Sequence, residues 1–230
     1  MMPEFTVEAW ERIAGWRDAV ETMPFIRALA DGTLPADAFA NYLSQDAAYL
    51  VEFSRILARA SQLAPDRPAQ AFFAASAHTA LEVESALHRD WLSAKAGLSP
   101  DALDAVEPSP VTAAYTNHLL AIGANGSYAE TVAAVLPCYW LYAHIGDVLL
   151  REAGDLTDHP YARWISTYAD AGFQESTRLA CGFADAAAAH VDAGIRERML
   201  RAFEISSMHE YFFFDQGLRR EGWPTPPVSR

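Results

Sequence analysis

Cysteine is scarce in this sequence: its 230 residues include only Cys138 and Cys181. Two cysteines cannot build a disulfide framework, and this usage is typical of a reducing compartment, so we expect a cytoplasmic protein. Basic residues are also few, with 17 Lys and Arg against 30 Asp and Glu and a formal net charge of −13. This charge argues against a nucleic-acid partner and against binding to an anionic membrane surface.

Long uninterrupted hydrophobic runs are lacking as well. The most apolar stretch, residues 131–150, contains Pro137, His144 and Asp147. We therefore expect a buried core helix there and no membrane span. Residues 1–10 have no basic region of the kind that begins a signal peptide.

Strand-like alternation followed by a hairpin turn is also missing, and almost every segment has helical periodicity. The sequence therefore predicts an all-α bundle of seven or eight helices. No linker-like break divides the chain, so residues 1–230 are expected to form a single domain. Caps, prolines and apolar stripes place the clearest helices at residues 8–21, 25–30, 35–63, 68–97, 109–122, 127–154, 158–171 and 192–220.

Two acidic residues interrupt apolar helical stripes. Asp46 lies in the stripe of helix 35–63, and Glu210 lies in that of the last helix. An unpaired buried charge is costly, so Asp46 either has a hydrogen-bonding partner or lines a cavity. Four aromatic residues follow Glu210, and apolar surroundings raise the pKa of a carboxyl group, which suits a general acid or base. The alternative is that the stripe around Glu210 is displaced by one position.

A thiol follows a proline inside the most apolar helix. Pro137 removes one helical hydrogen bond, Cys138 comes next, and Tyr142 lies one turn later on the same face as the thiol. This combination is consistent with a site. It is also consistent with a buried cysteine that behaves as a small hydrophobic residue. Cys181 has no such neighbours and is interpreted as structural.

One pair of residues is also compatible with a metal site. Glu84 and His88 share one helical face, as ligands do in helix-bundle iron sites. A dinuclear site needs a second such set, and His144 with Asp147 does not clearly supply it. We therefore expect no metal and no cofactor.

Several motifs, taken in order, resemble those of the TenA (thiaminase II) family. The resemblance extends from about residue 25 to about residue 218. The motifs are residues 25–34 (FIRALADGTL), 39–50 (FANYLSQDAAYL), 136–142 (LPCYWLY), 164–168 (WISTY) and 210–215 (EYFFFD).

The resemblance implies a heme-oxygenase-like helical bundle that binds no heme. It also implies a homotetramer that acts on a small pyrimidine. The implied reaction is hydrolysis of 4-amino-5-aminomethyl-2-methylpyrimidine to the hydroxymethyl pyrimidine, with cleavage of thiamin as a further activity. The chain departs from the family pattern at Ala47, where tyrosine is usual, and at Phe214, where tryptophan is usual.

By the same resemblance, Cys138 is the nucleophile, Glu210 is the acid and base, and Asp46 holds the amino group and ring nitrogen of the pyrimidine. The remaining pocket residues, each unremarkable in a helical core when taken alone, are Tyr49, Tyr115, Tyr142, Tyr168 and Phe213.

The hypothesis requires Cys138, Asp46 and Glu210 to meet in one hollow inside the bundle. There a thiolate would add to the electron-poor ring, which lets the exocyclic methylene expel its leaving group. One alternative is a non-catalytic, regulatory protein that binds a pyrimidine on the same fold. Another is a heme-oxygenase-like metal oxidase with Glu84 and His88 as ligands.

Overall fold

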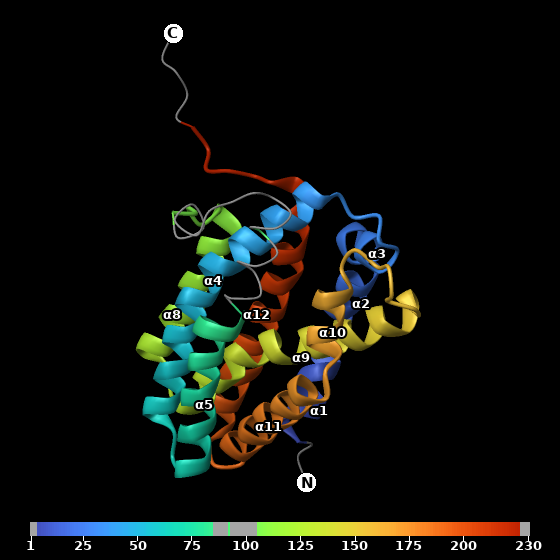
Figure 1. Cartoon of the computed structure of the whole chain (residues 1–230). Coiled ribbons are helices and arrows are strands. Elements are labelled where there is room, and N and C mark those ends of the chain that lie inside the picture. The colour runs from blue at the N-terminus through green and yellow to red at the C-terminus, as the bar shows by residue number, and fades with distance from the viewer. Residues whose placement is uncertain (1–3, 85–91, 93–104, 226–230) are drawn as a thin grey trace.

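The computed structural model describes residues 4–84, 92 and 105–225, and every regular element within these ranges is a helix (Figure 1). The prediction of an all-α fold is confirmed. The elements are α1 (Phe5–Arg12), α2 (Ala14–Thr22), α3 (Pro24–Ala30), α4 (Ala36–Leu63), α5 (Arg67–Thr79), the π-helical turn η1 (Ala80–Glu84), α8 (Pro110–Asn125), α9 (Tyr128–Ala153), α10 (Ala162–Ala169), α11 (Ala171–Ala188) and α12 (Ala193–Arg219).

Three long helices begin at residues whose side chains cap them, and these starts agree with the predicted ranges 109–122, 127–154 and 192–220. Ser109 caps α8, and Pro110 occupies its first turn. Ser127 and Glu130 form a reciprocal capping box at the start of α9. Asp192 accepts two backbone hydrogen bonds at the start of α12. These local signals therefore fix the start of each helix without help from distant residues.

Two segments differ from the prediction, and they account for most of the additional helices. The predicted helix 8–21 is divided at Ile13, whose φ of −95° and ψ of 11° separate α1 from α2. The predicted helix 158–171 begins later, because Asp155 accepts the backbone N–H of Thr157 and holds this segment in a turn. Asp170 then caps a separate helix, α11.

The predicted helix 68–97 is described only in part. Helix α5 ends at Thr79 and continues into the π turn η1. The side chain of Glu84, and His88 with its neighbours, lie outside the described residues.

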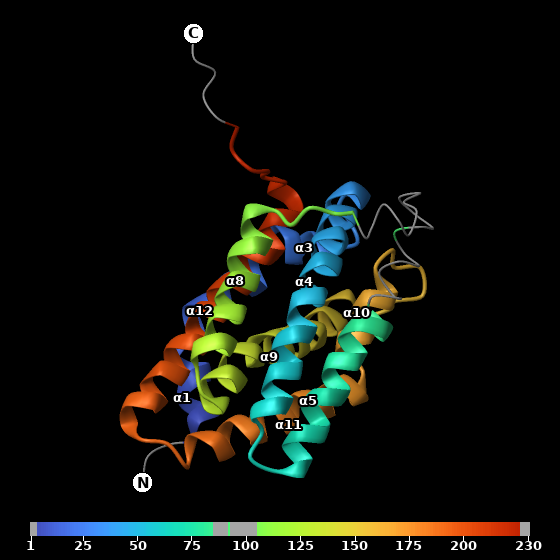
Figure 2. The same cartoon turned by 90° about the vertical axis from the view of Figure 1, so that its left-hand side faces the viewer.

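Helix α9 lies at the centre of the bundle. Figures 1 and 2 show α4, α5, α8 and α12 standing roughly side by side, with α9 crossing them. Helix α9 packs against α12, α11, α10, α4 and α8. It is long and apolar enough to cross a membrane, but 78% of its most apolar window is buried inside the protein. It is therefore the core helix that the sequence predicted, and it carries Cys138.

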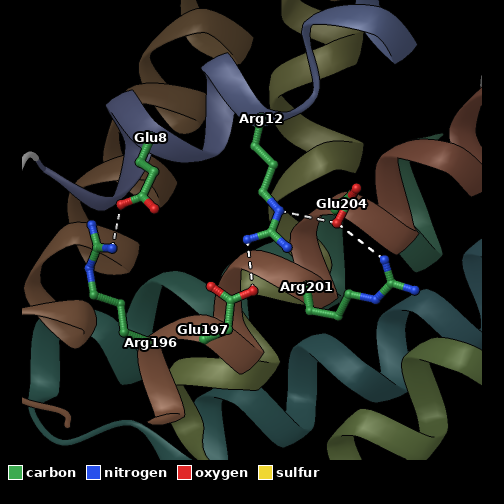
Figure 3. Close-up of polar contacts among 6 residues, drawn as sticks. All are labelled: Glu8, Arg12, Arg196, Glu197, Arg201 and Glu204. Carbon is green, nitrogen blue, oxygen red and sulfur yellow. Dashed lines mark hydrogen bonds and ion pairs between the residues drawn. The ribbon is translucent and has the colours of Figure 1, made fainter. Parts of the chain in front are cut away.

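Ion pairs attach the N-terminal helix to α12 (Figure 3). Arg12 bridges Glu197 at 2.9 Å and Glu204 at 3.1 Å, and Glu8 pairs with the buried Arg196. The carboxylate of Asp185 on α11 also accepts hydrogen bonds from α1. These contacts hold α1 against α11 and against the first half of α12, the helix whose second half carries Glu210.

Helix α10 approaches α9 at a glycine. A Cβ atom on Gly146 would lie 2.6 Å from the carbonyl carbon of Tyr168 and 2.8 Å from the backbone nitrogen of Ala169. Neither backbone atom can rotate away, so a side chain at Gly146 must push the two helices apart. The glycine therefore sets the position of Tyr168.

We predict that Gly146→Ala lowers the free energy of unfolding by about 1–3 kcal/mol, the usual effect of overpacking, and shifts Tyr168. Thermal unfolding followed by circular dichroism measures the effect. The matched control is Gly182→Ala in α11, where an added Cβ meets nothing within 4 Å. That substitution should raise stability by about 0.5–1 kcal/mol, since alanine is the better helix former. Equal effects of the two substitutions would contradict the packing argument.

Candidate active site

A cavity of about 180 Å³ lies beside Cys138, between α4, α5, α9, α10 and α11. Its wall includes Asp46 from α4, Cys138 and Tyr142 from α9, and Tyr168 from α10. The rest of the lining is largely apolar, with four residues that carry a hydroxyl group, and consists of Leu50, Phe53, Leu57, Phe72, Ala75, Ser76, Thr79, Tyr139, Phe173 and Ser176. A cavity with these features suits a small, flat ring that needs a few polar contacts.

Two tyrosines form a hydrogen-bonded pair next to Asp46. The hydroxyl groups of Tyr42 and Tyr142 lie 2.9 Å apart, and both side chains are buried. Burial raises the pKa of Tyr42 well above its usual value, and the nearby charge of Asp46 raises it further. Burial, Tyr42 and Asp46 do the same for Tyr142. Both phenols therefore stay protonated at neutral pH and can donate hydrogen bonds.

Glu210 is completely enclosed on α12, with 1% of its surface exposed. The hydroxyl group of Tyr115 on α8 donates to Oε1 of Glu210 at 2.6 Å. Burial raises the pKa of Glu210 to about 8, although the Tyr115 hydrogen bond lowers it. Glu210 is thus a carboxyl group that can hold or release a proton near neutral pH.

Glu210 does not line the 180 Å³ cavity, and neither do Tyr49, Tyr115 and Phe213. These residues form an aromatic layer around the carboxyl group. The ring of Tyr49 lies 5.0 Å from that of Tyr115 and 5.3 Å from that of Phe213. The predicted residues are therefore divided between the cavity wall and this adjoining buried layer.

Electrostatic interactions connect the residues of the cavity wall with the aromatic layer around Glu210. Besides burial, electrostatic interactions with Cys138 and Glu210 raise the pKa values of Tyr49 and Tyr115. The pKa of Tyr42 responds to burial, Asp46, Glu210 and Cys138 together. These effects require short distances in a medium of low dielectric constant. The thiol and the two carboxyl groups, distant in sequence, are therefore gathered around the same tyrosines.

Cys181 lies elsewhere, on α11, where it packs against the core. Burial and then the charge of Asp185 raise the pKa of Cys181 to about 12, so it remains a protonated thiol at neutral pH. A thiol in this state is a poor nucleophile.

Sequence reasoning missed Tyr42, although a signal was present. Tyr42 precedes Asp46 by four residues on α4 and therefore shares its helical face. Taken alone, a tyrosine at this position of an apolar stripe is typical of a helical core. The hydroxyl groups of Ser76, Thr79 and Ser176 were missed as well, since only the packing of α5 and α11 brings them to the cavity.

The residues considered for a metal site have other partners where the structure describes them. His144 lies 2.6 Å from Glu21, and Asp147 accepts a hydrogen bond from Gln174 at 3.2 Å. Over residues 4–84, 92 and 105–225 there is no group of three potential metal ligands.

Comparison with solved structures defines the class of protein. The chain superimposes on a TenA homologue from P. horikoshii OT3 with a TM-score of 0.84 and 26% identity, over 94% of this chain and 99% of that one. It also matches a domain from Shewanella denitrificans with a heme oxygenase-like fold, at a TM-score of 0.71 and 16% identity over 96% of this chain and 94% of that one. The protein is a helical bundle with the heme-oxygenase-like fold.

The family follows from sequence. Residues 10–220 match the TENA/THI-4/PQQC family, and the chain belongs to it. It is 34% identical to the aminopyrimidine aminohydrolase of Bacillus subtilis, over 98% of this chain and 94% of that protein. It is 41% identical to the thiamine biosynthesis multifunctional protein ThiED of Corynebacterium glutamicum over 95% of this chain, but spans only 27% of that longer protein.

Proposed function

We propose that this protein is an aminopyrimidine aminohydrolase of thiamin salvage. Its substrate is then 4-amino-5-aminomethyl-2-methylpyrimidine, which it hydrolyses to the hydroxymethyl pyrimidine and ammonia. The observation that carries the proposal is the shared placement of Asp46 and Cys138 on one small cavity, with Glu210 buried beside the same tyrosines. The 34% identity to an aminopyrimidine aminohydrolase over nearly the whole chain supports the same reaction.

Binding rests on the cavity wall. The carboxylate of Asp46 accepts hydrogen bonds from the amino group and the protonated ring nitrogen of the pyrimidine. Tyr142 and Tyr168 border the ring, and Tyr49 and Phe213 pack behind it. This arrangement orients an aminopyrimidine and leaves a carbon of its ring facing Cys138.

The first half of the reaction forms a bond between Cys138 Sγ and a ring carbon. The electron pair of the thiolate enters the ring, which loses its aromaticity. The exocyclic methylene then expels its amino group, to which Glu210 gives a proton, so that ammonia leaves. Tyr115 holds the Glu210 carboxyl group in position through its hydrogen bond.

The second half restores the starting enzyme. Glu210, now a carboxylate, takes a proton from water as the water oxygen adds to the methylene carbon. The ring regains its aromaticity when the bond to Sγ breaks and the thiolate leaves. One water is consumed, and one ammonia and one hydroxymethyl pyrimidine are formed, so the atoms balance.

An ammonia-release assay tests the proposal. The aminomethyl pyrimidine and thiamin are each incubated with the protein, and products are identified by mass spectrometry. We expect the hydroxymethyl pyrimidine from the first substrate, with one ammonia per turnover. Tight binding with recovery of intact ligand after long incubation would instead favour a non-catalytic, pyrimidine-binding protein.

We also propose that the protein is a cytoplasmic homotetramer. Both cysteines are thiols, as suits a reducing compartment. Trp16 on α2 and Tyr211 and Phe212 on α12 form an aromatic group at the surface, where Phe212 is 41% exposed. Such a group suits a contact between copies of the chain. Light scattering coupled to size exclusion gives the mass directly, and a monomer at micromolar concentration would contradict this assembly.

A further inference from the structure

Two histidines stand next to the Tyr115–Glu210 pair, and the proposed reaction does not use them. The ring of His209 stacks on the ring of Tyr115, with centroids 5.1 Å apart and planes at 12°. The ring of His118 lies 5.5 Å from that of His209. His118 is on α8, three residues after Tyr115, and His209 is on α12, directly before Glu210.

Tyr115 connects His209 with Glu210, its neighbour in the sequence. Adjacent residues on a helix point in different directions, so His209 and Glu210 do not form a dyad. Both residues contact Tyr115 instead. Glu210 accepts a hydrogen bond from the Tyr115 hydroxyl group, and the His209 ring stacks on the Tyr115 ring. The orientation of the Tyr115 phenol is thus set partly by His209.

We propose that His209, backed by His118, is a positioning residue that holds the Tyr115 phenol on Glu210 and keeps positive charge away from that carboxyl group. The proposal rests on the aminohydrolase function proposed above for the role of Glu210. It assigns to His209 no contact with the substrate.

The charge state of the histidines agrees with this role. Burial, and then the neighbouring His118, lower the pKa of His209 to about 4. Burial also lowers the pKa of His118, which a contact with the backbone of Ala202 partly offsets. Both rings are therefore neutral at neutral pH. A charged imidazolium at this place would stabilise the Glu210 carboxylate and would lower the pKa that burial raises.

Other titratable groups lie in the same region as Glu210 and must be held constant in any test. The titratable groups that α4, α9 and α8 contribute to this region are Tyr42, Asp46, Tyr49, Cys138, Tyr142, Tyr115 and His118. None of them is changed by a substitution at His209, which makes that position the cleanest probe.

Three substitutions at His209 distinguish the effect of a flat ring at this position from the effect of a positive charge. His209→Phe keeps a flat ring that cannot ionise, and it should retain kcat within about threefold of the native value. His209→Ala removes the stack and should lower kcat about tenfold while KM changes little, because proton transfer depends on the position of Glu210. His209→Arg places a permanent positive charge near Glu210 and should move the basic limb of the pH profile of kcat/KM down by about one unit.

A direct titration of Glu210 provides a readout besides turnover. The infrared band of its protonated carboxyl group is assigned by its loss in Glu210→Gln. The pH at which this band has lost half of its intensity should fall by about one unit in His209→Arg and stay unchanged in His209→Phe. The control is His190→Arg, an exposed histidine at the end of α11. Circular dichroism checks that each variant is folded.

The outcomes are distinguishable. Native kcat in folded His209→Ala, or an unshifted Glu210 titration in folded His209→Arg, would overturn the proposal. A native protein without turnover would count against the aminohydrolase function, and the infrared titration would still decide the role of His209. If His209→Arg fails to fold, His209→Lys replaces it in the same titration.

Discussion

Replacing Cys138 by serine is expected to lower ammonia release from the aminomethyl pyrimidine by about 10³-fold or more, since a serine hydroxyl does not ionise near neutral pH. In the proposed mechanism the thiol forms the covalent bond to the ring, and Asp46, on the same cavity wall, fixes the ring in front of it. Serine is similar in size, so the dissociation constant for the pyrimidine should change by less than about threefold. Steady-state kinetics and titration calorimetry measure the two quantities.

The second cysteine supplies a matched control. Cys181 is partly buried on α11, and its pKa of about 12 keeps it protonated. Cys181→Ser should therefore leave kcat within about twofold of the native value, with at most a loss of stability. A Cys138→Ser variant that kept more than about a tenth of native turnover would remove the covalent step from the mechanism. Equal losses in both variants would point to a general effect of removing a buried thiol.

The fold was predictable because its helix boundaries depend on local chemistry. Ser109 followed by proline, and Ser127 followed three residues later by Glu130, satisfy free backbone N–H groups within one turn. Such signals need no knowledge of the rest of the chain. Helical periodicity likewise identified the buried faces of α4, α9 and α12.

The breaks between short helices could not be predicted in the same way. No proline or glycine stands at Ile13, where α1 ends and α2 begins. The turn at residues 155–161 depends on the hydrogen bond from the Thr157 backbone N–H to Asp155, which replaces a helical start at Asp158. The carboxylate of Asp185, on α11, accepts a backbone hydrogen bond from the first turn of α1. Local sequence patterns cannot predict this contact, because the two residues are far apart in the sequence. These features depend on packing between distant elements.

The site shows the same division. Periodicity alone placed Asp46 and Glu210 on apolar faces, and both are buried. It could not show that Glu210 lies off the cavity wall, in a buried layer where Tyr115 donates a hydrogen bond to it. Nor could it find the contact between Tyr42 and Tyr142, because 100 residues separate them. Which helices cross, and where, is decided by the three-dimensional packing around α9.

Glu210→Gln is expected to lower kcat by about 10²–10⁴-fold, the usual contribution of a general acid and base. The amide keeps the shape of the carboxyl group and can still accept the Tyr115 hydrogen bond, so substrate binding should be retained. It cannot give a proton to the departing amine or take one from water. Single-turnover experiments with a labelled pyrimidine separate binding from chemistry, and a variant with near-native kcat would contradict the assignment.

The same substitution should change how stability depends on pH. Glu210 has a pKa of about 8 in the folded protein, against 4.5 for the unperturbed group. Between these two values the folded state holds a proton that the unfolded state has lost, so the native protein loses stability as pH rises from about 5 to about 8. Glutamine carries no such proton. As pH rises across this range, the melting temperature of Glu210→Gln should therefore increase relative to that of the native protein. The difference between the two melting temperatures should become constant above about pH 8. Parallel curves for the two proteins would show that Glu210 is not held protonated by burial, and they would weaken its assignment as the acid.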